Sequence, residues 1–165
     1  LAFGTASERM LERAATLPGR GQYFDLLEFD KYWEKHQTPN TPAVNLLYAL
    51  VAQLRYIDAE GVEARADRHW RMAERAWRWV DEDGARGELS VLAPEGRRSP
   101  TVTAYRLPEA LHGAPIVARL KDRGYTIGSG YGRLKETTIR IGHMGDHTET
   151  ELEQLLAELE EVLTR

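Results

Sequence analysis

The sequence predicts an α+β fold for the C-terminal part of the chain, with helices packed on a small sheet. Two observations predict it. From residue 88 on, short segments rich in β-branched residues alternate with helical ones in the order β-β-α-β-β-α. The last of these segments is a leucine-rich amphipathic helix. Helices laid on a sheet bury both kinds of apolar pattern at once, which makes a small layered domain the expected architecture.

The first part of the chain predicts one short strand and two short helices. "LAFGTAS" resembles a strand, and Ser7 can cap a helix that ends near Leu17, ahead of "LPGRG". Residues 25–36, "DLLEFDKYWEKH", predict the second helix. Residues 37–42, "QTPNTP", contain two prolines and no hydrophobic period, which predicts a loop.

Two long amphipathic helices are expected next. Pro42 can be the first residue of a helix that Thr41 caps and that ends near Gly61. The following helix begins at residue 62 and ends at Gly84. The expected apolar stripes are Ala43, Leu47, Leu50, Val51, Leu54 and Ile57 on the first helix, and Val62, Ala66, Trp70, Ala73, Trp77 and Val80 on the inner face of the second.

The sheet and its remaining helices follow. Strands are expected at residues 88–94, 101–108, 125–130 and 137–144, and helices at residues 115–124 and 147–165. Thr148 and Glu151 have the spacing of a capping box at the start of the last helix. Its expected buried stripe consists of Leu152, Leu155, Leu156, Leu159 and Leu163.

Composition narrows the function classes. A formal net charge of −4 gives no general attraction to nucleic acids or anionic membranes. The absence of cysteine excludes disulfides, thiolate metal sites and cysteine nucleophiles in this chain. No apolar run approaches the length that spans a membrane, and a cytoplasmic location is the default expectation. The chain starts without a methionine, as if cut from a longer protein.

Two groups of residues that could carry chemistry have plainer explanations. The helix from residue 62 interleaves arginines with tryptophans, but Asp67 with Arg71 and Glu74 with Arg78 are favourable i,i+4 pairs, so an amphipathic helix is preferred to a nucleic-acid surface. "HMGDH" brings three potential metal ligands close together, His143, Asp146 and His147. No residue supplies a fourth ligand, and no metal is expected.

Arg140 is the strongest candidate for a binding residue. It interrupts the strand "TTIRIGHM", where alternation puts Ile139 and Ile141 on one face and Thr138 and Arg140 on the other. That second face is either open to water or lines a cleft that takes an anion. An edge-strand arginine paired with a glutamate of the last helix is the plain alternative, and the residues alone leave the two explanations even.

The loop "TPNTP" is the second candidate. Thr38, Asn40 and Thr41 come immediately before a helix, so that hydroxyl, amide and helix N–H groups could bind a phosphate together. Ordinary capping by Thr41 is the alternative, and it is favoured in the absence of other observations. Gly128, Gly130 and Gly132 of "GSGYG" indicate a backbone that turns sharply or is closely approached.

Taken together, several stretches resemble the C-terminal half of class V, pyridoxal-phosphate-dependent aminotransferases of the alanine–glyoxylate and serine–pyruvate group. They are "HQTPNTPAVNLLYAL", "EGVEARADRHWRMAERA", "SPTVTAYRLPE" and "YTIGSGYGRLKETTIRIGHMGD", in this order along the chain. The resemblance implies an α/β protein overall, of fold-type I. Residues 1–41 would end the large cofactor domain, and residues 42–165 would form a linker helix and a small α+β domain.

The resemblance also implies roles for the two candidates. Arg140 would bind the α-carboxylate of an amino-acid or 2-oxo-acid substrate, which suits the rigid fork of a guanidinium. Thr41, Asn40 and Thr38 would reach across a homodimer interface to the phosphate of the pyridoxal phosphate held by the other subunit. Thr41 matches the family best, and Thr38 stands where some relatives carry a tyrosine.

The family's Schiff-base lysine lies upstream of the segment that "LAFGTAS" resembles, so the resemblance places no catalytic residue in this chain. None of its lysines, Lys31, Lys35, Lys121 and Lys135, occupies the required position. The expected partner is therefore the N-terminal half of the same enzyme, and the chain alone is expected to be inactive. The other hypothesis is a free-standing α+β module that binds a small carboxylate ligand through Arg140.

Overall fold

The computed structural model describes residues 1–82 and 89–164, which divide into two compact units, residues 1–59 and 60–165. Each unit is described by itself. The first contains the helices α1 (Glu8–Ala15), α2 (Leu26–Trp33) and most of α3 (Val44–Glu60). Both predicted short helices are present, and Ser7 accepts a hydrogen bond from the Met10 N–H as the expected cap of α1. Asp25 caps α2 in the same way.

Two expectations for the first unit are wrong. Residues 1–7 form no strand, because a strand needs a neighbouring strand to pair with and the described residues of this unit offer none. The helix α3 begins at Val44 and not at Pro42. Thr41 is not its cap, because the first carbonyl to accept a helical hydrogen bond is that of Ala43, from Leu47 N–H.

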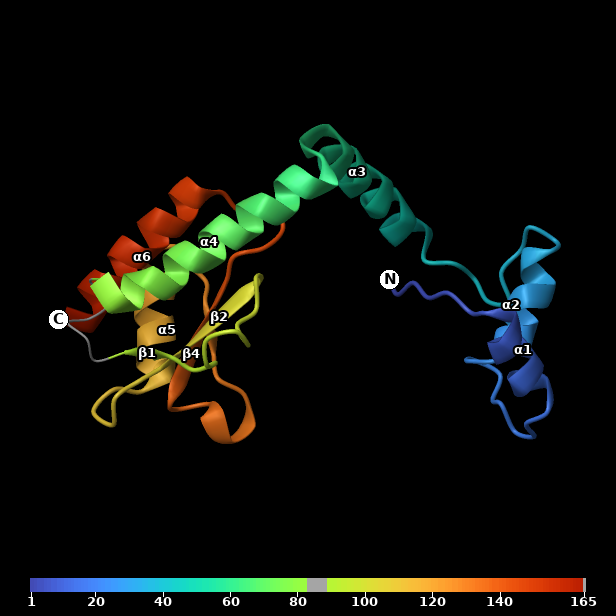
Figure 1. Ribbon diagram of the computed structural model, residues 1–165, viewed down its shortest axis with the longest axis horizontal. Coiled ribbons are helices and arrows are strands. Elements are labelled where there is room, and N and C mark those ends of the chain that lie inside the picture. Colours follow the sequence, from blue (N-terminus) through green and yellow to red (C-terminus); the bar gives the residue numbers. More distant parts are fainter. Residues whose placement is uncertain (83–88, 165) are drawn as a thin grey trace. The chain divides into compact units, whose positions relative to one another are not determined.

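The second unit is the predicted α+β layer. Its sheet has the order β1-β2-β4-β3, with every neighbouring pair antiparallel. The strands are β1 (Ser90–Val91), β2 (Val102–Arg106), β3 (Gly128–Ser129) and β4 (Thr138–Gly142), and the helices are α4 (Val62–Glu82), α5 (Gly113–Asp122) and α6 (Glu149–Thr164). The predicted order β-β-α-β-β-α is confirmed (Figure 1).

Helices cover one face of this sheet and form the core with it. Ile139 and Ile141 of β4 are fully buried among apolar side chains of α4, α5 and α6. The predicted capping box begins α6: Glu151 accepts from Thr148 N–H at 2.7 Å, and Glu151 N–H donates to the Thr148 hydroxyl at 3.2 Å. The buried residues of α6 are Leu152, Leu156, Leu159 and Val162, with Leu155 and Leu163 partly buried beside them.

The inner face of α4 differs from the prediction. Its buried residues are Met72, Ala73, Ala76, Trp79 and Val80, whereas Val62, Ala66 and Trp70 are exposed. Trp70 and Trp77 instead pack edge to face, 6.3 Å apart. Only the second half of α4 lies on the core, which is why a stripe drawn along the whole helix fails. The predicted end at Gly84 lies outside the described residues.

The arginines of α4 pair with acidic residues of other elements. Arg71 binds Glu149 of α6 at 2.8 Å, and not Asp67 as expected. Arg75 binds Glu153 of α6 at 2.6 Å. Ion pairs between α4 and α6 therefore neutralise part of the positive charge on α4 that could have suggested nucleic-acid binding.

In the described part of the chain, no helix is both long enough and apolar enough to cross a membrane.

Candidate functional site

Arg140 lies at the middle of β4, on the face of the sheet that the helices do not cover. Its neighbours Ile139 and Ile141 point into the core, and alternation along the strand turns Arg140 to the other side, where it is exposed. β4 lies between β2 and β3, so it is not an edge strand. The explanation of Arg140 as an edge-strand arginine is therefore wrong.

The side chain of Arg140 has one hydrogen bond, in which Nε donates to the carbonyl oxygen of Ser129 at 2.8 Å. It forms no ion pair with any residue that the structure describes. The last helix packs on the opposite face of the sheet, where its Glu153 and Glu158 bind Arg75 and Arg123. The alternative pairing with a glutamate of this helix is therefore also wrong, and a guanidinium with unused donors remains on an open face.

The glycine-rich segment before β4 forms a compact turn beside this arginine. A short 3-10 helix, η2 (Gly132–Leu134), begins at a glycine with the left-handed φ of +56°. A Cβ at Gly130 would lie 2.0 Å from the carbonyl oxygen of Leu134, which no real contact allows. The Thr138 hydroxyl donates to that same carbonyl at 2.9 Å. The expected sharp turn and close backbone approach are confirmed for this segment.

The loop that precedes α3 gathers the other predicted residues. The Thr38 hydroxyl donates to the carbonyl of Asn40 at 2.7 Å, so its hydrogen is used within the loop. The side chains of Asn40 and Thr41 are exposed and have no partner among the described residues.

The first turn of α3 adds backbone donors to this loop. The N–H groups of Asn45 and Leu46 have no intrahelical acceptor. They lie beside a hollow of about 450 Å³ that residues 42–46 line. A hydroxyl, an amide and helix N–H groups are the donors that suit a phosphate, so these residues fit the phosphate of a cofactor.

The two groups of predicted residues belong to different units. Thr38, Asn40 and Thr41 lie in the first unit and Arg140 in the second. Their predicted roles stay predictions. Sequence reasoning did not single out Ser129, whose contribution to Arg140 is a backbone carbonyl. No residue type marks such a role, and only the pairing of β3 with β4 places it.

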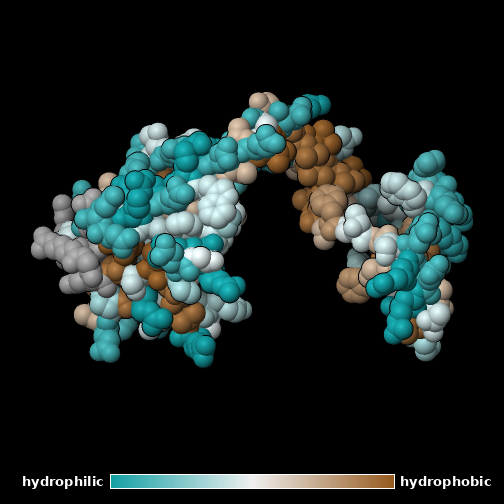
Figure 2. All heavy atoms as spheres, viewed as in Figure 1, coloured by the Kyte–Doolittle hydropathy of each residue, from teal (hydrophilic) through white to brown (hydrophobic). Residues whose placement is uncertain are grey.

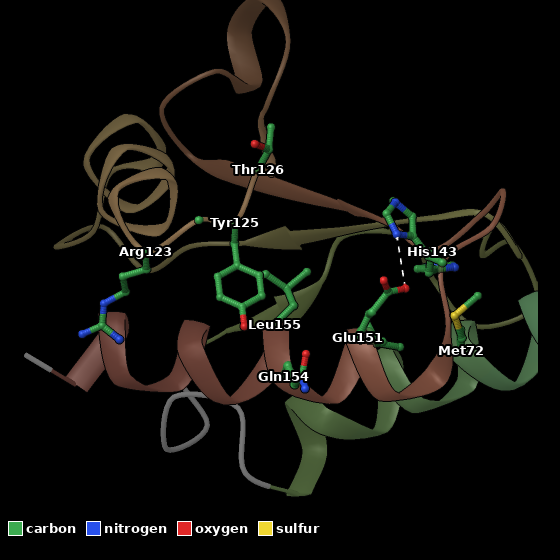
Figure 3. Close-up of a pocket in the computed structure, with 12 residues that line it drawn as sticks. Met72, Arg123, Tyr125, Thr126, His143, Glu151, Gln154 and Leu155 are labelled. Atoms are coloured by element: carbon green, nitrogen blue, oxygen red, sulfur yellow. Dashed lines mark ion pairs between the residues drawn. The ribbon is translucent and has the colours of Figure 1, made fainter.

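A separate hollow of about 790 Å³ lies on the second unit, and Arg140 is not part of its lining (Figure 3). Glu151, Gln154 and Leu155 of α6 form one side, and the Tyr125 ring points toward them. Its charged groups already have partners. Arg123 binds Glu158 and Glu161 of α6, and the His147 ring lies 3.7 Å from the Glu151 carboxylate.

The residues of "HMGDH" have structural roles. Trp77 Nε1 donates to the Thr103 hydroxyl at 3.0 Å, and this hydroxyl shares a second hydrogen bond with His143 Nε2 at 2.9 Å. Burial lowers the pKa of His143 and so favours its neutral ring. Asp146 binds Arg65 at 2.6 Å. Among the residues that the structure describes, no cluster of three or more His, Asp or Glu could hold a metal.

Comparison with known proteins shows which proteins this chain is similar to. No family model matches the chain. An uncharacterized aminotransferase of Methanocaldococcus jannaschii is 37% identical over 83% of this chain and 35% of its own length. The serine–glyoxylate aminotransferase of Arabidopsis thaliana is 34% identical over 96% of this chain and 39% of its own length. The chain is homologous to the C-terminal part of class V aminotransferases.

Solved structures of class V aminotransferases agree with this assignment. The alanine–glyoxylate aminotransferase of Nostoc superposes with a TM-score of 0.83 and 30% identity, over 96% of this chain and 42% of its own. The chain thus spans about two fifths of its relatives, whose N-terminal part lies outside it. One relative of Synechococcus, 33% identical over 99% of this chain, is named as the small subunit of a soluble hydrogenase. Class V aminotransferases in general depend on pyridoxal phosphate.

Proposed function

We propose that this chain is part of a pyridoxal-phosphate-dependent aminotransferase, in which Arg140 binds the carboxylate of the substrate. The observation that carries the proposal is the guanidinium of Arg140, which stands on an open sheet face without a counter-charge among the described residues. An arginine in this state offers paired N–H donors to a planar carboxylate. The homology to aminotransferases supports this ligand over other anions.

The proposed reaction moves an amino group between a small amino acid, such as alanine or serine, and a 2-oxo acid, glyoxylate or pyruvate. Two relatives support glyoxylate, because their names give it as a substrate together with serine or alanine. When bound, pyridoxal phosphate supplies the electron sink for amino-group transfer. Thr41 and Asn40 would hold its phosphate by hydrogen bonds, with Thr38 ordering the loop around them.

The proposal includes the surroundings of the site. Residues 1–41 would close a large domain, and residues 42–165 would form the linker helix and small domain. The partners would be the N-terminal half of the enzyme, which holds the cofactor-binding lysine, and a second subunit of a homodimer. We further propose a cytoplasmic location, the default expectation for this chain. The chain alone would be inactive because it contributes binding groups and not the reacting lysine.

A chimera tests the proposal directly. The chain replaces the matching C-terminal part of the Arabidopsis serine–glyoxylate aminotransferase, and serine-dependent consumption of glyoxylate is assayed with pyridoxal phosphate present. We expect activity and the visible absorbance of the bound cofactor. A folded chimera that binds the cofactor but transfers no amino group from serine or alanine would contradict the proposal.

Arg140→Ala in this chimera should reduce substrate-carboxylate binding by about 2–5 kcal/mol, because a desolvated carboxylate loses its charged partner. The measurement is kcat/KM for the 2-oxo acid, which should fall while cofactor absorbance stays unchanged. Arg133→Ala is a matched control, because Arg133 is exposed in the nearby turn η2. Equal activity of the Arg140 variant and the parent would refute the assignment.

A free-standing carboxylate-binding module remains the second candidate, and one observation favours it: residues 60–164 have a hydrophobic core of their own. It predicts that the 165-residue chain is a folded monomer that binds pyruvate or glyoxylate through Arg140. Size-exclusion chromatography with light scattering and calorimetric titration would decide, since an aggregating chain without pyruvate affinity excludes a free-standing module.

A further inference from the structure

Arg140 has unusually small neighbours on both adjacent strands. Residues directly opposite each other on antiparallel strands point to the same face of the sheet. The residue opposite Arg140 on β3 is Gly128, and the one on β2 is Ala104. The side chain of Arg140 is therefore flanked by the methyl group of Ala104 on β2 and by a hydrogen atom of Gly128 on β3. It has space to bend toward either strand.

The side chain of Arg140 lies toward Gly128. A Cβ built on Gly128 would be 3.2 Å from Nη2, 3.5 Å from Nε and 3.6 Å from Cζ of Arg140. Three atoms of one planar group at similar distances mean that the guanidinium lies along the glycine. The contact at Nη2 would be tighter than most Cβ contacts. A side chain at residue 128 would therefore occupy space that the guanidinium now borders.

This position determines which donors are available. Nε is bound to the Ser129 carbonyl at 2.8 Å, one residue further along β3. Nη1 and Nη2 have no partner among the described residues. A carboxylate can bind a guanidinium through both Nη atoms or through Nε and one Nη. With Nε already occupied, only the end that carries Nη1 and Nη2 offers two parallel donors.

We infer that Gly128 is a positioning residue for Arg140: by lacking a side chain it lets the guanidinium lie on β3, where Ser129 holds Nε and a substrate carboxylate binds end-on to Nη1 and Nη2. The carboxylate part of this inference rests on the proposed function. The positioning part does not, because it concerns contacts within the chain.

The backbone gives no other reason for a glycine here. Gly128 does not have the left-handed φ that favours glycine, so alanine fits the strand conformation. Gly130 is different, because a Cβ there would collide with the backbone of Leu134. Gly142 is the matched control. It shares β4 and its open face with Arg140, and a Cβ there would meet only the flexible end of Met144, at 3.7 Å.

The test is nuclear magnetic resonance on the full 165-residue chain labelled with nitrogen-15. The Nε–H signal of Arg140 is assigned by its loss in Arg140→Lys, and its hydrogen exchange is compared in Gly128→Ala, Gly142→Ala and the parent. We expect the Nε–H of Arg140 to exchange about 2- to 10-fold faster in Gly128→Ala, which corresponds to the loss of one hydrogen bond. In Gly142→Ala its exchange should be unchanged. Equal exchange in the two alanine variants would overturn the inference.

Pyruvate is then titrated into the parent chain. End-on binding predicts that the Nη signals of Arg140 shift while Nε–H stays protected. Loss of Nε protection on addition of pyruvate would overturn the end-on geometry. Failure of the proposed function would be seen in a different experiment, as an Arg140→Ala chimera that keeps full activity. The difference in Nε–H exchange between Gly128→Ala and Gly142→Ala would remain in that case.

A destabilised Gly128→Ala variant is resolved by a double variant. If the new methyl group clashes with the guanidinium, Gly128→Ala/Arg140→Ala regains the thermal stability of Arg140→Ala. If stability does not return, the glycine is required by the backbone, and the inference fails.

Discussion

The two units of the chain contain similar numbers of apolar residues in their helices, but they differ in how far they bury these side chains. In residues 60–164, apolar side chains from α4, α5, α6 and the sheet are buried together, and several, such as Ile139 and Leu159, are fully inaccessible. In residues 1–59, no apolar side chain reaches that state, and Asp25 alone is buried. On α3, Leu47, Val51 and Leu54 of the predicted stripe remain exposed, as the apolar surface of this helix shows in Figure 2.

This difference shows that the local features that start and end a helix are distinct from the packing that stabilises it. Caps and propensity are enough to set the ends of α1 and α2. Most of the stability of a helix in a protein comes from packing its apolar face, and only the second unit provides a surface for that. The α3 stripe is amphipathic by sequence, yet nothing in the first unit covers it.

The largest expected effect tests this contrast in burial. Leu159→Ala should lower the free energy of unfolding of the 165-residue chain by about 2–5 kcal/mol, because it leaves a cavity in the core. Leu54→Ala, on the exposed stripe of α3, should change it by less than about 0.5 kcal/mol. Urea unfolding followed by tryptophan fluorescence measures both. Comparable losses in the two variants would mean that the first unit has a core of its own.

An intermediate effect is expected at the loop of the first unit. In the chimera, Thr41→Ala should weaken retention of pyridoxal phosphate by about 1.5–3 kcal/mol, the range for a hydrogen bond to a charged group. Spectroscopic titration of the cofactor provides the measurement. Thr38→Ala is the matched control and should have a smaller effect, because its hydroxyl is already bound to Asn40. Normal retention by the Thr41 variant would argue against a phosphate role for this loop.

The smallest effect concerns Glu60, the first residue of the second unit. Hydrogen bonds from Arg68 and then Arg65 lower the pKa of its carboxyl from 4.5 to about 2. Because the folded protein binds this proton less readily than the unfolded chain, the ion pairs stabilise the fold above pH 4.5. That contribution should be lost as the pH falls from 4.5 toward 2.

Chemical unfolding of the parent and of Glu60→Gln across this pH range tests the prediction. The variant should lose stability less steeply on acidification, and the two curves should converge at the acid end. Glu63→Gln is the control, since Glu63 is exposed on α4 without an ion pair among the described residues. A parallel pH dependence for the Glu60 variant and the parent would show that these ion pairs do not stabilise the fold.

Local patterns predicted much of this molecule correctly. The Thr148 and Glu151 box fixed the start of α6, and the alternation around Arg140 assigned its face. Periodicity failed on α4, where Trp70 was expected inside and lies outside. Hydrophobicity alone cannot tell which half of a long helix has a sheet beneath it. The expected strand at residues 1–7 failed for a related reason, because pairing requires a partner elsewhere in the chain.

The sequence by itself determined the order of elements from residue 88 on, the caps of α1 and α6, and the presence of one arginine on the outward face of a buried strand, because these depend on residues close together in the chain. Tertiary structure decided the rest. That β4 is an interior strand and that Gly128 and Ser129 lie beside Arg140 follow from strand pairing. That α6 packs on the far face of β4 follows from burial of its apolar stripe in the core. Pairing joins residues distant in sequence, and its register is set by burial of the whole sheet.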